Sequence, residues 1–131
     1  MAYHVVDGAR LEWEERPPGV EGQQPRRAAD ITTAAELKAS RGRVWRYPPR
    51  TRGRRHADHA QEEVFVVVSG TLTMLLEDPP ERVDVGPRSV VAVEPMTPLQ
   101  VRNETDEELV LYAYGAPPDQ AGADFFDDVE L

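Results

Sequence analysis

Hydrophobic residues gather in short runs along the middle of the chain, and turn-forming residues separate these runs. The run at residues 63–68 (EVFVVV) is almost continuously apolar and rich in β-branched side chains, which predicts a central strand covered on both faces. Further runs predict strands at 43–47, 71–77, 82–85, 90–93, 100–103 and 109–114. Successive strands with turns between them are typical of a sandwich or barrel, so the pattern predicts an all-β domain.

The two ends of the chain differ from this strand-rich middle. We expect one domain in which residues 1–40 form an N-terminal arm packed on the barrel, residues 41–116 the barrel core, and residues 117–131 a short acidic tail. In the arm, residues 3–6 are a candidate strand, and the spacing of Thr33 and Glu36 matches a capping box, which predicts one helical turn. Phe125 and Phe126 predict a tail that docks on its own barrel or on a second subunit, with a flexible tail as the alternative.

Composition agrees with a single small folded domain. The chain has 131 residues, of which 40% are hydrophobic and 30% charged, and its 12 prolines and 9 glycines suit short strands joined by frequent turns. A net charge of −9 disfavours nucleic acid and anionic membranes as partners. There is no cysteine, which excludes disulfides and thiolate zinc sites, and no apolar segment approaches the roughly 20 residues that span a bilayer. We therefore expect a cytoplasmic protein.

One segment carries a recognisable motif. The stretch PPRTRGRRHADHAQEEVFVVVSG resembles the first motif of the cupin family, which runs Gly, five residues, His-x-His, three or four residues, Glu, six residues, Gly. His56, Glu63 and Gly70 fall on motif positions. Arg50 stands in the place of the first glycine, and Asp58 stands in the place of the second histidine.

The stretch EPMTPLQVRN resembles the second cupin motif, in which three residues separate a histidine from a following asparagine. Asn103 matches the asparagine, whereas Leu99 replaces the histidine and Met96 replaces a glycine. The resemblance implies a small antiparallel double-stranded β-helix, the cupin or jelly-roll barrel. It also implies a homodimer, and an interior divalent metal held by three histidines and a glutamate.

Three of those four ligand positions keep side chains that can donate to a metal. His56 and Asp58 alternate onto one strand face and Glu63 approaches from the next strand, whereas Leu99 cannot ligate. Because oxygen donors dominate this set, iron or manganese fits it better than zinc, and a protein without a metal is the alternative. In that case Glu63 pairs with an arginine such as Arg46 or Arg54, or stays protonated with a raised pKa.

Other polar residues are candidates for the same site. His59 points to the opposite strand face from His56 unless a bulge turns it inward. Four arginines precede the motif and predict either an anion-binding barrel mouth or a solvated loop: Arg50, Arg52, Arg54 and Arg55. The candidate ligand-binding residues are Arg46, Arg54, Gln100 and Tyr112.

These observations leave three functional hypotheses open. In the first, the barrel binds a small organic molecule in its interior beside an incomplete metal site and need not be catalytic. In the second, the chain is a metal-dependent enzyme of the dioxygenase or isomerase class that uses His56, Asp58 and Glu63. In the third, it is a structural or regulatory dimerisation module.

Overall fold

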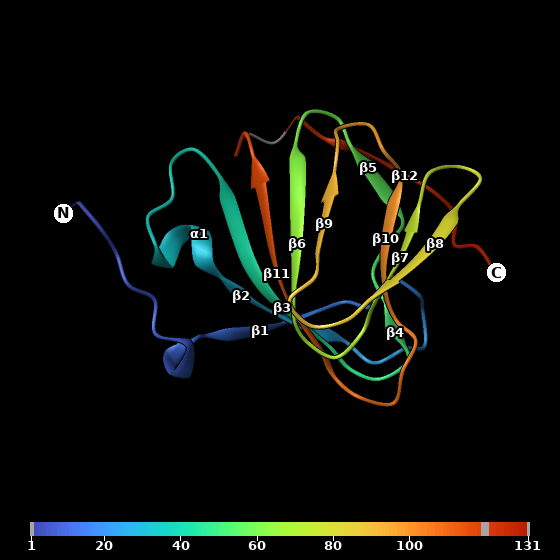
Figure 1. Cartoon of the computed structure of the whole chain (residues 1–131), viewed down its shortest axis with the longest axis horizontal. Coiled ribbons are helices and arrows are strands. Elements are labelled where there is room, and N and C mark those ends of the chain that lie inside the picture. Colours follow the sequence, from blue (N-terminus) through green and yellow to red (C-terminus); the bar gives the residue numbers. More distant parts are fainter. Residues whose placement is uncertain (1, 119–120, 131) are drawn as a thin grey trace.

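The computed structural model describes residues 2–118 and 121–130, which form two antiparallel β-sheets that face each other (Figure 1). The larger sheet contains, in spatial order, β1 (Trp13–Arg16), β2 (Arg26–Asp30), β3 (Arg41–Tyr47), β11 (Leu109–Ala116), β6 (Glu62–Ser69) and β9 (Val90–Val93). The second sheet contains β12 (Ala123–Phe125), β5 (His56–Asp58), β10 (Leu99–Asn103), β7 (Leu72–Leu76) and β8 (Glu81–Val85), with β4 (Thr51–Arg52) paired to β10.

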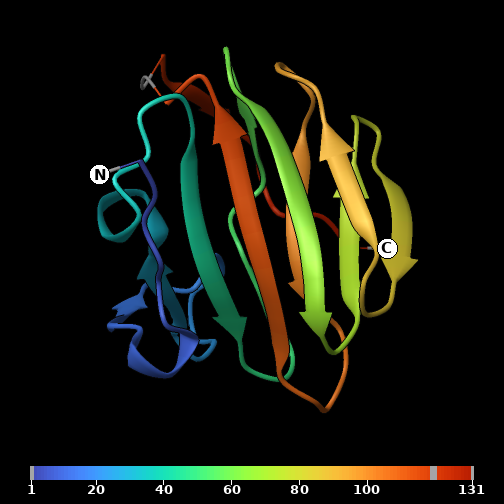
Figure 2. The ribbon, with the colours of Figure 1, turned by 60° about the vertical axis from the view of Figure 1, so that its left-hand side comes forward.

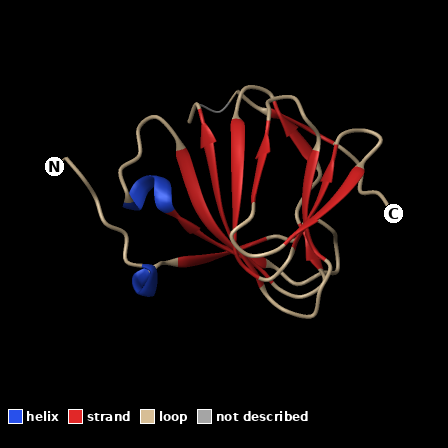
Figure 3. Cartoon of the chain, in the orientation of Figure 1, coloured by secondary structure: helices blue, strands red, loops and turns tan. Residues whose placement is uncertain are grey.

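Strands dominate the described chain, as Figure 3 shows. Its helical segments are the short η1 (Gly8–Arg10) and α1 (Ile31–Ala34). Strands that are far apart in the sequence are paired in the sheets. For example, β11, near the end of the sequence, pairs with both β3 and β6. This confirms the predicted all-β antiparallel double-stranded β-helix.

The main core fills part of the space between the two sheets. Phe65 and Leu111 point inward from the larger sheet, and Leu72 and Met74 from the second, each at most 4% exposed. Each fully buried side chain of this size contributes about 1.5–3 kcal/mol through removal of apolar surface from water. The packing therefore fixes which face of each strand points inward.

The apolar strand β6 lies inside its sheet, between β11 and β9, but only one of its faces is fully covered. Val67 on the inner face is 1% exposed, whereas Val68 on the outer face is 46% exposed. The expectation that both faces are covered is therefore wrong. At the end of β6, Gly70 adopts φ +83°, and a Cβ there would lie 2.5 Å from the Glu108 carbonyl oxygen, so the turn needs glycine.

The N-terminal region adds two strands to the larger sheet, since β2 pairs with both β1 and β3. Residues 3–6 are not a strand; Val6 packs with Ile31 and Val44 in a second, smaller apolar cluster. A helical turn is present as α1, but it ends at Ala34 instead of following Thr33, so the predicted position is wrong. Its cap is Asp30, whose carboxylate accepts a hydrogen bond from the Thr33 backbone N–H at 3.3 Å.

The C-terminal tail docks on its own barrel through residues 121–130. Strand β12 pairs with β5, and the Phe126 backbone N–H donates to the Arg55 carbonyl at 3.0 Å. The segment after β12 then meets the face of β10 that points away from the core. There Asp128 accepts a hydrogen bond from Gln100 at 2.7 Å and lies 3.6 Å from Arg102.

Removing the Asp128 carboxylate tests how firmly the tail is held. Gln100 and the Arg102 side chain are 1% and 5% exposed, so Asp128→Ala leaves buried donors short of a partner. We expect the free energy of unfolding in urea to fall by about 1–3 kcal/mol. The neighbouring Asp127→Ala is the matched control, because the tail contact of Asp127 uses its backbone carbonyl. Equal stability of the two variants would contradict this role.

Candidate metal centre and cavity

Strands β5 and β6 bring three ligand-type side chains together. His56 and Asp58 lie two residues apart on β5, so both point to the inner face, and Glu63 points inward from β6. One ligand atom from each lies within 4.8 Å of the others. The structure thus brings together the three residues that the motif spacing indicates.

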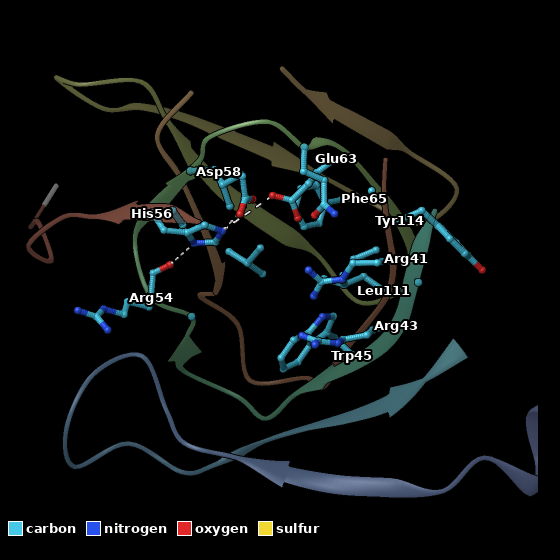
Figure 4. Close-up of a pocket in the computed structure, with 18 of the residues that line it drawn as sticks. Arg41, Arg43, Trp45, Arg54, His56, Asp58, Glu63, Phe65, Leu111 and Tyr114 are labelled. Carbon is cyan, nitrogen blue, oxygen red and sulfur yellow. Dashed lines mark hydrogen bonds and ion pairs between the residues drawn. The ribbon is translucent and has the colours of Figure 1, made fainter. Parts of the chain in front are cut away.

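The His56 ring is oriented by a backbone contact. Its Nδ1 lies 2.9 Å from the Arg54 carbonyl oxygen, an acceptor, so Nδ1 carries the donated proton. Its Nε2 faces the carboxylates, 3.4 Å from Asp58 Oδ2 and 3.9 Å from Glu63 Oε1 (Figure 4). In a neutral His56 this leaves the Nε2 lone pair directed at the two carboxylates, as a metal ligand requires.

Glu63 contains an unusual buried atom. Its Oε1 is inaccessible to solvent and has no hydrogen-bond partner in the described chain. Burial is the largest influence on Glu63 and raises its pKa to about 7, with Asp58 adding to the increase and His56 opposing it. Of the two alternatives for a metal-free site, Glu63 does not pair with Arg46 or Arg54. The structure instead favours the other alternative, a carboxyl group with a raised pKa.

The pKa values of His56 and Asp58 also differ from their ordinary values, because these two side chains contact each other. Burial would lower the pKa of His56, but the nearby carboxylates of Asp58 and Glu63 outweigh it and raise the pKa to about 10. Burial would raise the pKa of Asp58, but the hydrogen bond to His56 outweighs it and lowers the pKa to about 2. Without a metal, a protonated His56 is thus the cation that holds the two carboxylates together at neutral pH.

This donor set fits a divalent metal. One imidazole nitrogen and two carboxylates converge, the ring is already anchored through Nδ1, and Glu63 Oε1 lacks a partner that a cation would supply. Leu99 occupies the fourth ligand position of the cupin motifs and supplies no donor atom there. It is in register with His56 and 2% exposed. The cluster therefore offers three ligands.

The cluster lines a cavity of about 340 Å³ between the sheets. Arginine and aromatic side chains share its wall with the cluster, and Figure 4 shows how several of them lie. They are Arg26, Arg41, Arg43, Trp45, Tyr47, Arg54, Phe65 and Phe125. The cavity thus combines cationic, aromatic and carboxylate groups.

Two of these arginines, Arg41 and Arg43, are not among the residues predicted from the sequence. The signal that could have identified them is the alternation along β3, which places them on the same inward face as Trp45 and Tyr47. Of the arginines next to the motif, Arg54 does line the cavity, with its guanidinium carbon 3.9 Å from the centre of the Phe125 ring.

The remaining arginines of that loop have other partners. Arg50 pairs with Asp106 at 3.1 Å, Arg52 with Asp128 at 2.7 Å, and Arg55 with Asp78 at 3.1 Å. These contacts spread the four arginines over different parts of the surface. The cluster seen in the sequence is therefore not one anion site in the folded chain.

Four other candidate residues lie away from the cavity. His59 binds Asp124 at 2.8 Å and is not part of the His56 cluster. Arg46 pairs with Glu108 at 3.0 Å, and the Tyr112 ring stacks on Tyr114 within the smaller apolar cluster. Gln100 is buried against the tail.

Solved structures with the same architecture are numerous. The polyketide cyclase RemF from Streptomyces resistomycificus superposes with a TM-score of 0.77 at 17% identity, covering 96% of this chain and 87% of that one. A sugar phosphate isomerase of the cupin superfamily from Silicibacter pomeroyi gives 0.74 at 18%, covering 93% and 91%. A protein described as a predicted oxalate decarboxylase from Thermotoga maritima gives 0.73 at 16%, covering 86% and 97%. At these identities the likeness concerns the fold.

No curated protein matches the chain. No helix in the described residues is long and apolar enough to cross a membrane. The Cupin domain family matches residues 43–114, more than half of the chain, and this segment contains the His56 cluster and most of the cavity wall. The protein therefore belongs to the cupin family.

Proposed function

We propose that this cupin binds a small organic molecule in its interior, beside a divalent metal held by His56, Asp58 and Glu63. The observation that carries the proposal is the cavity of about 340 Å³ onto which this cluster opens. A volume at the lower end of the range of ligand sites suits a small compound. The mixed wall offers both apolar contact and charged groups that would orient it.

Iron or manganese is the metal that suits this site. The set contains two carboxylates and one imidazole, and harder ions prefer such oxygen-rich sets to the nitrogen and sulfur ligands common around zinc. His56 would ligate through Nε2, while its Nδ1 donates to the Arg54 carbonyl. Glu63 Oε1 would gain the partner it lacks.

A metal-dependent enzyme is the second candidate, favoured by the position of the cluster on the cavity wall. Three protein ligands on one side leave room for a bound molecule to approach from the cavity. A metal bound there supplies Lewis-acid chemistry toward an oxygen of that molecule. The related structures include proteins named as an isomerase, a cyclase and a predicted decarboxylase, so the reaction type of this chain stays open within the fold.

Metal titration tests the ligand set. We expect chelator-treated protein to take up about one equivalent of manganese or iron(II), followed by electron paramagnetic resonance or calorimetry. His56→Ala and Glu63→Gln should each weaken binding at least about tenfold, because each removes one of three ligands. His59→Ala is the control, since His59 contacts Asp124 outside the cluster. Wild-type affinity in His56→Ala would refute the assignment.

We also propose that two copies associate through the outer face of β6 and β9. Figure 2 looks onto this face of the larger sheet, where no other described segment crosses these two strands. Val68 and Val90 are 46% and 58% exposed there, next to Val64 and Val66. An exposed apolar sheet face of this kind favours association with a second identical face.

Sedimentation velocity tests this association. We expect the wild-type protein to sediment as a dimer, and Val68→Glu combined with Val90→Glu to sediment as a monomer because buried charges would oppose pairing. Val5→Glu is the control, since Val5 is 82% exposed on the N-terminal segment. A monomeric wild-type protein, or a dimer that survives both glutamates, would contradict the proposal.

A further inference from the structure

Arg41 and Arg43 form a pair of cations on the cavity wall. Both project from the inward face of β3, and Figure 4 shows them reaching toward the space in front of His56. Among residues 2–118 and 121–130, no carboxylate lies within ion-pair distance of either guanidinium, whereas Arg46, Arg50 and Arg52 each have such a partner. Neither guanidinium is therefore held in an ion pair within the described chain, and both are free to bind an anion in the cavity.

Holding two arginines side by side has an electrostatic cost. They are two residues apart on one strand face, so their side chains leave the sheet next to each other. Burial, followed by the positive charges of Arg41 and Arg16, lowers the pKa of Arg43 from its usual range, while the carboxylates of Asp30 and Glu14 act in the opposite direction. An anion between the guanidinium groups would relieve both the repulsion and the lost hydration.

The cavity as a whole carries an excess of positive charge. Three arginines of the larger sheet line it (Arg26, Arg41 and Arg43), against two carboxylates, Asp58 and Glu63, which the metal would engage. The Arg54 guanidinium points away from the cavity in Figure 4 and does not contribute. This excess is the reverse of the whole chain, whose net charge is −9. Charge of one sign in a cleft with low-dielectric walls concentrates the field and attracts ligands of the opposite sign.

The rest of the wall is suited to an apolar, planar ligand body. Trp45 lies beside the arginine pair, with the Arg43 guanidinium carbon 5.9 Å and the Arg26 guanidinium carbon 4.8 Å from its ring centre. Phe65 and Leu111 add hydrocarbon surface. Arg41 lies in the same cross-strand row as Glu63, with Gly115 of β11 between them, whereas Trp45 lies farther along β3, beyond Arg43. The arginine pair therefore lies between Glu63 and Trp45 along this sheet.

We infer that the ligand is an organic carboxylate whose anionic group binds Arg41 and Arg43, beside Glu63 of the His56 cluster, while its body packs against Trp45. Planar guanidinium groups match the two oxygens of a carboxylate in parallel hydrogen bonds, which favours this anion. The inference rests on the proposed function, because it assigns the chemical class of the molecule that occupies the same cavity.

Calorimetry with matched acids and amides tests the charge directly in the unaltered protein. The probes are benzoate, phenylacetate and cinnamate, their neutral amides, and phenyl phosphate, each with and without manganese. We expect at least one acid to bind at least about tenfold more tightly than its amide, because the amide loses the charge-assisted contact. Phenyl phosphate binding more tightly than every acid would overturn the carboxylate assignment.

Variants then locate the contact. Arg41→Gln and Arg43→Gln should each weaken binding of the acid at least about tenfold and leave binding of the amide unchanged. Arg50→Gln is the control, since Arg50 pairs with Asp106 outside the cavity. Wild-type affinity for the acid in both cavity variants would overturn the inference.

The two proposals fail in different ways. If acid and amide bind equally, the cavity is a binding site but the arginine pair does not select the ligand, and this inference alone is wrong. If none of the probes binds the wild-type protein, the inference and the proposed interior binding site are both contradicted.

Discussion

The pairing of the three-residue strand β5 with its two neighbours is the constraint on which the candidate site depends. On one side, His56 is in register with Leu99 of β10; on the other, it is in register with Phe125 of β12. This double pairing fixes which face of β5 points inward, and a slip of one residue would turn His56 and Asp58 away from Glu63. The C-terminal segment is thus part of the scaffold of the site.

Charge is distributed unevenly between the two faces of the barrel wall. On the outside, Asp128 of the tail contacts Arg52 and Gln100, and Arg102 donates to the Val129 carbonyl at 2.6 Å. On the inside, the described chain offers no carboxylate within ion-pair distance of Arg41 and Arg43. Asp128 of the tail therefore offsets the charges of Arg52 and Arg102 on the outside, whereas the inner pair has no such acidic partner in the described chain.

The fold and the three-residue cluster could be predicted from the sequence because both follow from local order. Alternating strands and motif spacing fix them, and His56, Asp58 and Glu63 lie within eight positions of one another. Ligand contacts were harder to predict because they depend on partners far along the chain. The arginines near residue 52 look like one group, yet Arg50, Arg52 and Arg55 bind Asp106, Asp128 and Asp78 in three different places.

The most direct test of the site is nuclear magnetic resonance titration of the His56 ring nitrogens in metal-free protein. If β5 holds His56 between Asp58 and Glu63, the imidazole stays protonated through neutral pH and titrates with a pKa of about 10. A pKa for His56 near the ordinary histidine value of about 6.5 would show that the three side chains do not converge, and the proposed metal site would be wrong.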